Sequence, residues 1–183
     1  MLQTNEQYDS IIAICQDIFS KKMQDYGSAW RILRTSSLTD QIYIKAKRIR
    51  SIEEKGVSKV DEGVFPEFIG ITNYAIMALI QLELDGDEDL EIEKDRCLFM
   101  YDAYFVQAKD LMSNKNHDYD EAWRDLRVSS LTDLILMKLM RIKQIEDNKG
   151  ETIISEGLDA NYLDIINYAV FAMIRIEELK EAK

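Results

Sequence analysis

The sequence has little that would interrupt regular secondary structure, with one proline and seven glycines among 183 residues. Sheets depend on frequent turns, and turns depend on these two residue types. Long windows of the chain instead carry apolar residues at helical spacing, without the alternation of a strand. The sequence therefore predicts an all-α fold.

The chain also lacks the short motifs that carry common chemistries. It has no glycine-rich phosphate loop and no GxSxG, CxxC or HExxH pattern, and it has a single histidine. These absences exclude P-loop nucleotide hydrolases, nucleophile-elbow hydrolases, dithiol redox proteins and zincins. Any binding site has to be built from carboxylates, amides, cations and aromatic rings.

Positive charge is in deficit. Lys and Arg total 23 against 34 Asp and Glu, a formal net charge of -11. This balance argues against polymeric nucleic acid as a partner, because binding it requires a basic surface that replaces counterions. No uninterrupted apolar run reaches the roughly 18 residues that span a bilayer, and the N-terminus lacks a basic region followed by an apolar one. We therefore expect a cytoplasmic protein with no membrane partner.

The most informative feature is an internal repeat. Residues 25–53 and 118–146 align without a gap and are identical at 18 of 29 positions, where chance would give roughly 2. Two copies are too few for a solenoid and suit two halves about a pseudo-twofold axis, as in a fused homodimer. We predict a tandem duplication of a three-to-four-helix unit packed as a bundle with a shared core. Repeat 1 is 1–86 and repeat 2 is 87–183, joined by an acidic link near 85–95. Further pairing into a homodimer is left open.

Each repeat should contain three long helices and one short one. Apolar spacing predicts helices near 6–22, 38–55 and 66–84, and near 90–114, 131–149 and 158–180, with a short helix or turn at 28–34. Ser37 and Asp40 resemble a capping box, Gly56 and Gly150 are expected to end helices, and Pro66 suits a first turn. Cys15 and Cys97 are not equivalent in the repeats, so we expect both to be buried apolar residues, unconnected by a disulfide.

The second helix of each repeat carries cations in an unexpected place. Lys138 lies within the apolar stripe of its helix and Lys45 does the same in repeat 1, with Arg141 and Arg48 three residues later. A buried ammonium has to be paired or directed at a ligand. The two alternatives are an ion pair with a carboxylate of the next helix, and a cationic phosphate-binding pocket.

The last helix carries a polar seam through apolar surroundings. Asn161, Asp164 and Asn167 follow one another at a spacing of three, with Glu156 just before the helix. Carboxylate and amide oxygens of this kind are ligands for Mg²⁺, which binds few protein groups and keeps waters. Gly70 stands in repeat 1 where Asp164 would be, while Glu67 and Asn73 remain, so repeat 2 has the fuller set. The alternative is that Asp164 pairs with a cation of the preceding helix.

Aromatic residues recur beside these polar groups. Trp123 stands in the repeated DYxxAWR stretch, as Trp30 does in repeat 1, and Tyr168 follows Asn167. Such rings serve either as core anchors or as platforms on which a nucleobase stacks. We name Trp123 and Tyr168 as the candidate base-stacking residues.

The stretches DYDEAW, SLTDLILMKLMRI and DIINYAVFA, in that order, resemble the nucleotide modification associated domain family. That family is similar in its helical pattern to all-α nucleoside triphosphate pyrophosphatases of the MazG and dimeric dUTPase type. The resemblance implies paired four-helix units in which carboxylates hold magnesium for cleavage between the α and β phosphates. The E-x-x-D signature of that group falls on Asp164 and Asn167, which keeps one carboxylate, and its E-x-x-E pair has no clean counterpart.

These observations lead to two hypotheses. In the first, the chain binds a nucleotide and, with Mg²⁺, hydrolyses it to the monophosphate and pyrophosphate. Glu156 and Asp164 would hold the metal, Asn167 would orient a water or a sugar hydroxyl, and the lysine and arginine pairs would offset phosphate charge. In the second, the chain is a non-catalytic helical interaction or scaffolding module whose polar residues tie its helices together.

Overall fold

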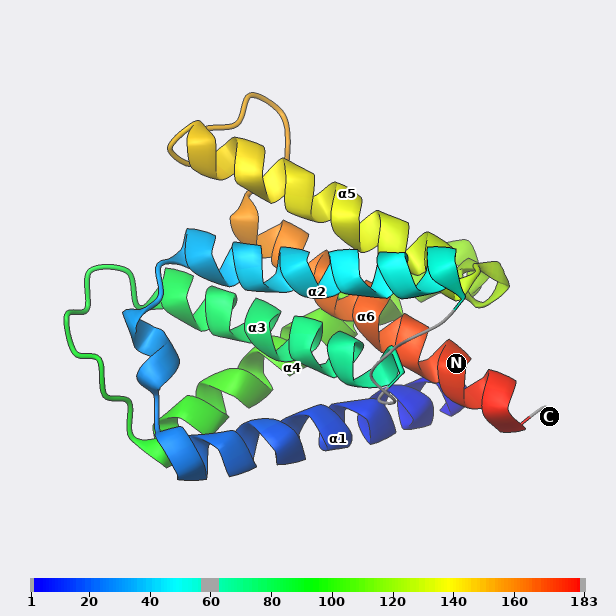
Figure 1. The fold of residues 1–183 in the computed structure, drawn as a ribbon, viewed down its shortest axis with the longest axis horizontal. Helices are drawn as coiled ribbons and strands as arrows, with labels where there is room; N and C mark the ends of the chain where they lie inside the picture. The colour runs from blue at the N-terminus through cyan, green and yellow to red at the C-terminus, as the bar shows by residue number, and fades with distance from the viewer. Residues whose placement is uncertain (1, 57–62, 182–183) are drawn as a thin grey trace.

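The structure is a computed structural model that describes residues 2–56 and 63–181. Within them the chain is all-α, as predicted. Repeat 1 comprises α1 (Leu2–Tyr26), the 3₁₀ helix η1 (Ala29–Ile32), α2 (Thr35–Lys55) and α3 (Phe65–Glu83). Repeat 2 has the same order: α4 (Lys94–Tyr119), η2 (Ala122–Asp125), α5 (Val128–Asp147) and α6 (Leu158–Glu181). Figure 1 shows the order of these elements along the chain.

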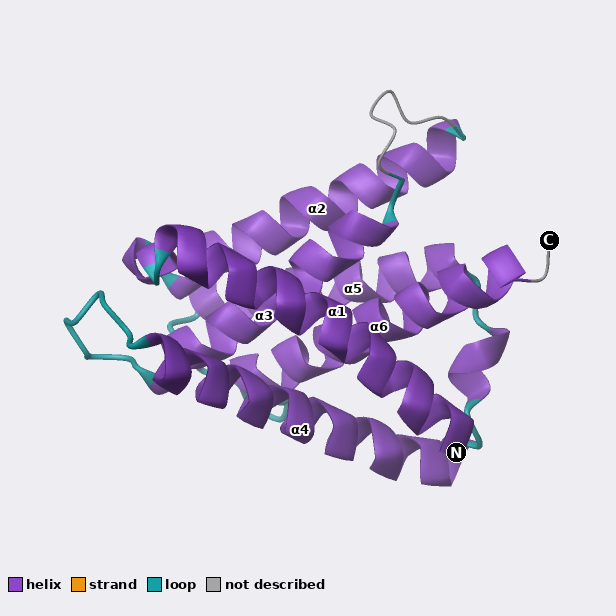
Figure 2. Ribbon diagram, turned by 90° about the horizontal axis from the view of Figure 1, so that it is seen from below, coloured by secondary structure: helices purple, strands orange, loops and turns teal. Residues whose placement is uncertain are grey.

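The two repeats pack about a pseudo-twofold axis, and each extensive contact between two α-helices has a counterpart. Within the repeats α2 packs on α3 and α5 on α6, while across the axis α3 meets α6, α2 meets α5 and α1 meets α4. The first helix of each repeat also packs against the last helix of the other. Figures 1 and 2 show α2 beside α3, with α1 and α4 on the same side of the bundle. The tandem duplication thus forms one bundle.

Two buried asparagines join the repeats symmetrically. The Tyr8 hydroxyl donates to Asn167 Oδ1 at 2.7 Å, and the equivalent Tyr101 hydroxyl donates to Asn73 Oδ1 at 2.6 Å. Each amide Nδ2 then donates to a backbone carbonyl in the first helix of its own repeat, which is that of Ala108 for Asn167 and that of Cys15 for Asn73. Each asparagine therefore connects the first helices of both repeats to its own helix.

Further paired contacts line the axis. The Thr39 hydroxyl donates to Glu146 at 2.8 Å, and the equivalent Thr132 hydroxyl donates to Glu53 at 3.0 Å. Ion pairs that flank these bonds follow the same symmetry, joining Lys143 to Asp40 and Arg50 to Asp133. The antiparallel register of α2 and α5 is thus fixed by two copies of one contact set.

The buried apolar residues form a single cluster to which both repeats contribute, so the expected shared core is present. Helix α3 is apolar and long enough to cross a membrane, but 67% of its most apolar window is buried by the rest of the protein. It is therefore a core helix of the bundle. Cys15 and Cys97 are free and buried, as expected.

Helix boundaries were predicted less well than helix identities. Helix α2 begins at Thr35 and has no side-chain cap bond at its N-terminus, so the predicted capping box at Ser37 is wrong. Gly56 does end α2 in the left-handed conformation at φ 65°, and proline does occupy the first turn of α3. Helix α5 ends at Asp147, before the expected Gly150, and α1 extends beyond 6–22 at both ends.

Candidate functional site

Asp164 lies at the centre of the most buried charged cluster among the described residues. Its side chain is only 5% exposed, and its two oxygens each accept from a different lysine. Oδ2 is 2.6 Å from Nζ of Lys138 on α5, and Oδ1 is 2.6 Å from Nζ of Lys115 on α4. The ion-pair alternative proposed from the sequence is therefore the arrangement observed for Lys138, with a second lysine added.

This donor set does not fit a magnesium ion. Mg²⁺ needs free carboxylate oxygens in octahedral geometry, and both oxygens of Asp164 already bind ammonium groups. Glu156 is exposed in the loop before α6 and lines a different, open cavity of about 660 Å³ together with Arg141 and Asn161. Within the described residues no cluster of three or more metal-binding side chains occurs.

Beside Asp164 is a cavity of about 390 Å³. Its wall includes Lys115, Tyr119, Trp123, Asp164 and Tyr168. Asn167 and Phe171 also line it, so the structure brings four of the predicted residues together here: Trp123, Asp164, Asn167 and Tyr168. Lys138 does not line this cavity but pairs with Asp164, which does. Glu156 and Arg141 line the other cavity.

The same cavity is present in repeat 1, at about 470 Å³. Lys22, Tyr26, Trp30 and Tyr74 line it, and they are the counterparts of Lys115, Tyr119, Trp123 and Tyr168. Both volumes fall within the range of about 300–1,000 Å³ that is usual for small-molecule sites. The duplication has therefore preserved a cavity with one lysine, two tyrosines and one tryptophan.

The aromatic residues differ in how free their rings are. Trp123 is 7% exposed, stacks on Phe171 with ring centroids 4.1 Å apart, and has the Arg124 guanidinium 4.5 Å from its ring centre. Its ring already has two stacking partners. Tyr168 is half-buried, and burial together with the nearby Asp164 charge raises its pKa. Tyr119 and its counterpart Tyr26 are each 70% exposed, so they present the most accessible rings of the two cavities.

In repeat 1 the lysine equivalent to Lys138 pairs with a carboxylate at a different position. Lys45 and Arg48 both pair with Glu67 on α3, and Lys45 Nζ lies 3.3 Å from Glu67 Oε2. Glu67 occupies the position of Asn161, and Gly70 occupies that of Asp164. Arg141, the counterpart of Arg48, is exposed and forms no ion pair within the described residues. Glu62, the counterpart of Glu156, lies outside the described residues.

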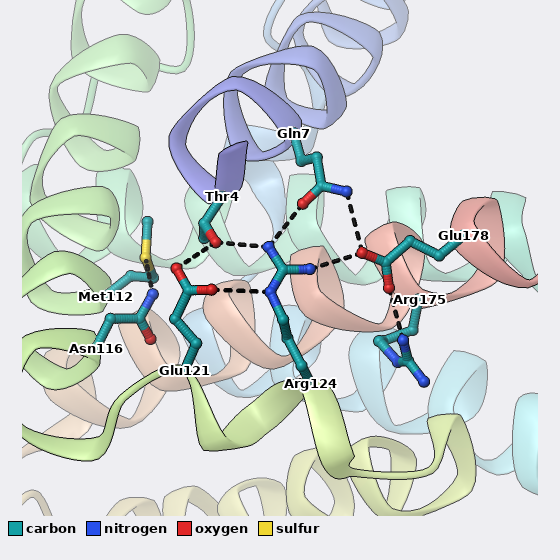
Figure 3. A network of polar contacts seen from close by, with 8 residues as sticks. All are labelled: Thr4, Gln7, Met112, Asn116, Glu121, Arg124, Arg175 and Glu178. Carbon is teal, nitrogen blue, oxygen red and sulfur yellow. Dashed lines mark hydrogen bonds and ion pairs between the residues drawn. The ribbon is translucent and has the colours of Figure 1, made fainter. Parts of the chain in front are cut away.

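The arginine of the DYxxAWR stretch is a structural clamp. Figure 3 shows Arg124 at the centre of a network in which it donates to Glu121 and Glu178, and to Thr4 and Gln7 at the start of α1. In repeat 1 the equivalent Arg31 donates to Gln81 and to backbone carbonyls of the link before α4. Each repeat thus uses this arginine to hold the chain at or just before the first helix of the other repeat.

This clamp predicts an acid-sensitive contribution to stability. The hydrogen bond from Thr4, together with Arg124, lowers the pKa of Glu121 from 4.5 to about 2. Because the folded-state pKa lies below the unfolded one, the carboxylate stabilises the fold above about pH 5, and this contribution is lost between about pH 5 and pH 2. Urea unfolding across this range should show a stability difference between wild type and Glu121→Gln that shrinks as pH falls. Glu91→Gln, at an exposed position, is the control, and a pH-independent difference for Glu121→Gln would contradict the assignment.

Sequence reasoning missed Lys22 and Lys115, and Tyr26 and Tyr119. The signal was present, because both pairs are identical in the two repeats at the offset that defines the duplication. The lysines lie three residues before the aligned stretch, and the tyrosines lie within it beside the more conspicuous tryptophan. Extending the alignment of the repeats toward the N-terminus would have found the lysines.

Comparison with known proteins agrees with this duplicated architecture. The family described as nucleotide modification associated domain 1 matches residues 22–82 and 115–176, once in each repeat. No curated protein and no solved structure matches the chain. The two matches together cover more than half of the sequence and include the lysine, tyrosine and tryptophan residues of both cavities. The chain therefore belongs to the nucleotide modification associated domain 1 family.

Proposed function

We propose that this protein binds a nucleotide in the equivalent cavities of its two repeats. The observation that carries the proposal is the lysine, the accessible tyrosine and the tryptophan-lined wall that recur at equivalent positions in both repeats. A lysine offers a point charge to a phosphate, and an exposed tyrosine offers a ring face to a base. The family description supports the same class of ligand.

The finer hypothesis is Mg²⁺-dependent cleavage to a nucleoside monophosphate and pyrophosphate, as in MazG-type enzymes. Its metal ligands would be Glu156 and Asp164, which line different cavities, and the oxygens of Asp164 are held by lysines. We therefore propose binding and derive no metal-dependent step. A pyrophosphate-release assay with and without Mg²⁺ tests the finer hypothesis directly.

A non-catalytic scaffolding module is the second candidate function. It is favoured by the internal bonds of Asp164, Asn167 and Glu67, which account for these side chains without a ligand. It leaves unexplained why Lys22 and Tyr26, which form no hydrogen bond or ion pair with any described residue, recur as Lys115 and Tyr119.

We expect a cytoplasmic protein with no polymeric nucleic acid as partner. We also propose that pairing into a homodimer is not required for the cavities, since each lies within one repeat.

The test is a thermal-shift panel of nucleoside mono-, di- and triphosphates, each with and without Mg²⁺, on the full chain. A ligand at 100 times its dissociation constant adds about 2.7 kcal/mol of stability, which is a shift of several degrees at this size. Tyr26→Ala and Tyr119→Ala should reduce the shift. Phe99→Ala, 75% exposed and lining neither cavity, is the matched control. If no nucleotide at millimolar concentration shifts the transition, the scaffolding function replaces this proposal.

A further inference from the structure

The two repeats differ at one position in a way that identifies a ligand group. In repeat 2, the Asp164 carboxylate bridges Lys115 and Lys138 at 2.6 Å each. Both lysines recur in repeat 1 as Lys22 and Lys45, but Gly70 stands where Asp164 would be. Repeat 1 thus keeps the two cations and has no carboxylate at the position from which Asp164 bridges them in repeat 2.

A small cavity of about 230 Å³ lies at this place in repeat 1. Lys22, Lys45 and Gly70 line it together with Pro66 and Asn73. The glycine has let the Lys45 side chain lie against the helix, because a Cβ at Gly70 would be 2.6 Å from Lys45 Cε. That contact is with the end of a flexible side chain, so Lys45 can swing outward to meet a ligand.

The charges around the cavity favour an anion. Lys45 and Arg48 share a single carboxylate, that of Glu67, and Arg48 makes the closer contact with it. Lys45 is 3.3 Å from the same carboxylate, and Lys22 is exposed and forms no ion pair with a described residue. Among the described residues Lys22 is therefore unpaired and Lys45 shares one carboxylate with Arg48, whereas in repeat 2 the Asp164 carboxylate pairs with both equivalent lysines.

We infer that Lys22 and Lys45 form a phosphate subsite over Gly70 in repeat 1, and that Asp164 fills the equivalent subsite in repeat 2. The subsite adjoins the larger aromatic cavity of repeat 1, because both are lined by Phe19, Lys22, Tyr74 and Met77. A phosphoryl group between the lysines would place the remainder of a nucleotide toward Tyr26 and Trp30. That the phosphate belongs to a nucleotide rests on the proposed function. That a phosphate binds at this place rests on the two lysines alone.

The decisive variant is Gly70→Asp, which gives repeat 1 the carboxylate of repeat 2. Affinities of the full chain for inorganic phosphate, pyrophosphate, a nucleoside monophosphate and the corresponding nucleoside are measured by isothermal titration calorimetry. Gly70→Asp should weaken binding of the three phosphate ligands by about tenfold or more, because charge-assisted hydrogen bonds are lost. Gly70→Ala adds the Cβ without the charge and should keep most of the affinity. Unchanged phosphate affinity in Gly70→Asp would overturn the inference.

A second pair of variants does not depend on the glycine. Lys21 and Lys22 are both exposed, so Lys21→Gln and Lys22→Gln should both fold. Lys22→Gln should weaken phosphate binding by about tenfold, whereas Lys21→Gln should leave it unchanged because Lys21 lines neither cavity of repeat 1. Equal losses in both variants would contradict the assignment of the subsite to Lys22. If nucleotide binding is insensitive to Lys22→Gln and Gly70→Asp, this inference is wrong and the proposed function stands. If phosphate binds but the nucleoside adds no affinity, the proposed function is wrong and this inference stands.

Discussion

Replacing Asp164 by alanine is expected to destabilise the protein by about 3–5 kcal/mol, the usual cost of removing one partner of a buried ion pair. The loss arises mainly at Lys138, whose side chain is 7% exposed and which forms no other ion pair among the described residues. Lys115 is 48% exposed and can return to water. Urea unfolding of wild type and variant at neutral pH measures the difference.

The matched control for Asp164→Ala is Asp133→Ala, which removes a carboxylate from an exposed pair. Asp133 is 62% exposed and 3.7 Å from Arg50, so its loss should cost less than about 1 kcal/mol. Adding Lys138→Met to Asp164→Ala should recover much of the stability, because no buried charge is then left unpaired. If Asp164→Ala is as stable as wild type, the ion pairs do not hold the fold, and the carboxylate is free to act as a ligand.

Replacing Asn167 by alanine is expected to cost about 2–4 kcal/mol. The Tyr8 hydroxyl, on a side chain that is 0% exposed, would lose its acceptor, and an unsatisfied buried group costs about 1–3 kcal/mol. The bond from the amide to the Ala108 carbonyl is lost as well. Denaturant unfolding followed by circular dichroism measures the cost.

Asn73→Ala is the equivalent substitution in repeat 1. Its amide makes the same two bonds, to Tyr101 and to the Cys15 carbonyl, so a structural role predicts similar losses in both variants. A catalytic role for Asn167, as predicted from the sequence, would instead give an asymmetric effect on turnover with little effect on stability. Wild-type stability in either variant would count against a structural role for the tyrosine–asparagine hydrogen bonds between the repeats.

The fold could be predicted because its signals are local and repeated. Helical periodicity located the six long helices, and the duplication predicted two halves about a pseudo-twofold axis with a shared core. Helix ends were less accurate because they depend on bonds that the pattern does not show. The N-terminus of α2, for example, has no side-chain cap at all.

The site could be predicted only in part because its contacts join residues from different helices. The pairing of Lys138 with Asp164 was one of two alternatives, since both are charged residues on apolar helices. The role of Lys115 depends on where α4 lies beside α6, and that placement is not encoded in spacing along the chain. The bond from Tyr8 to Asn167 likewise crosses the pseudo-twofold axis, which periodicity alone does not position.

The exchange of Asp164 for Gly70 would not be open to a protein built from two identical subunits. In such a dimer one codon specifies both positions, so a substitution that closes one subsite closes the other as well. Joining the repeats in one chain lets mutation act on each half separately. One half can then carry a carboxylate at this position while the other half carries a glycine.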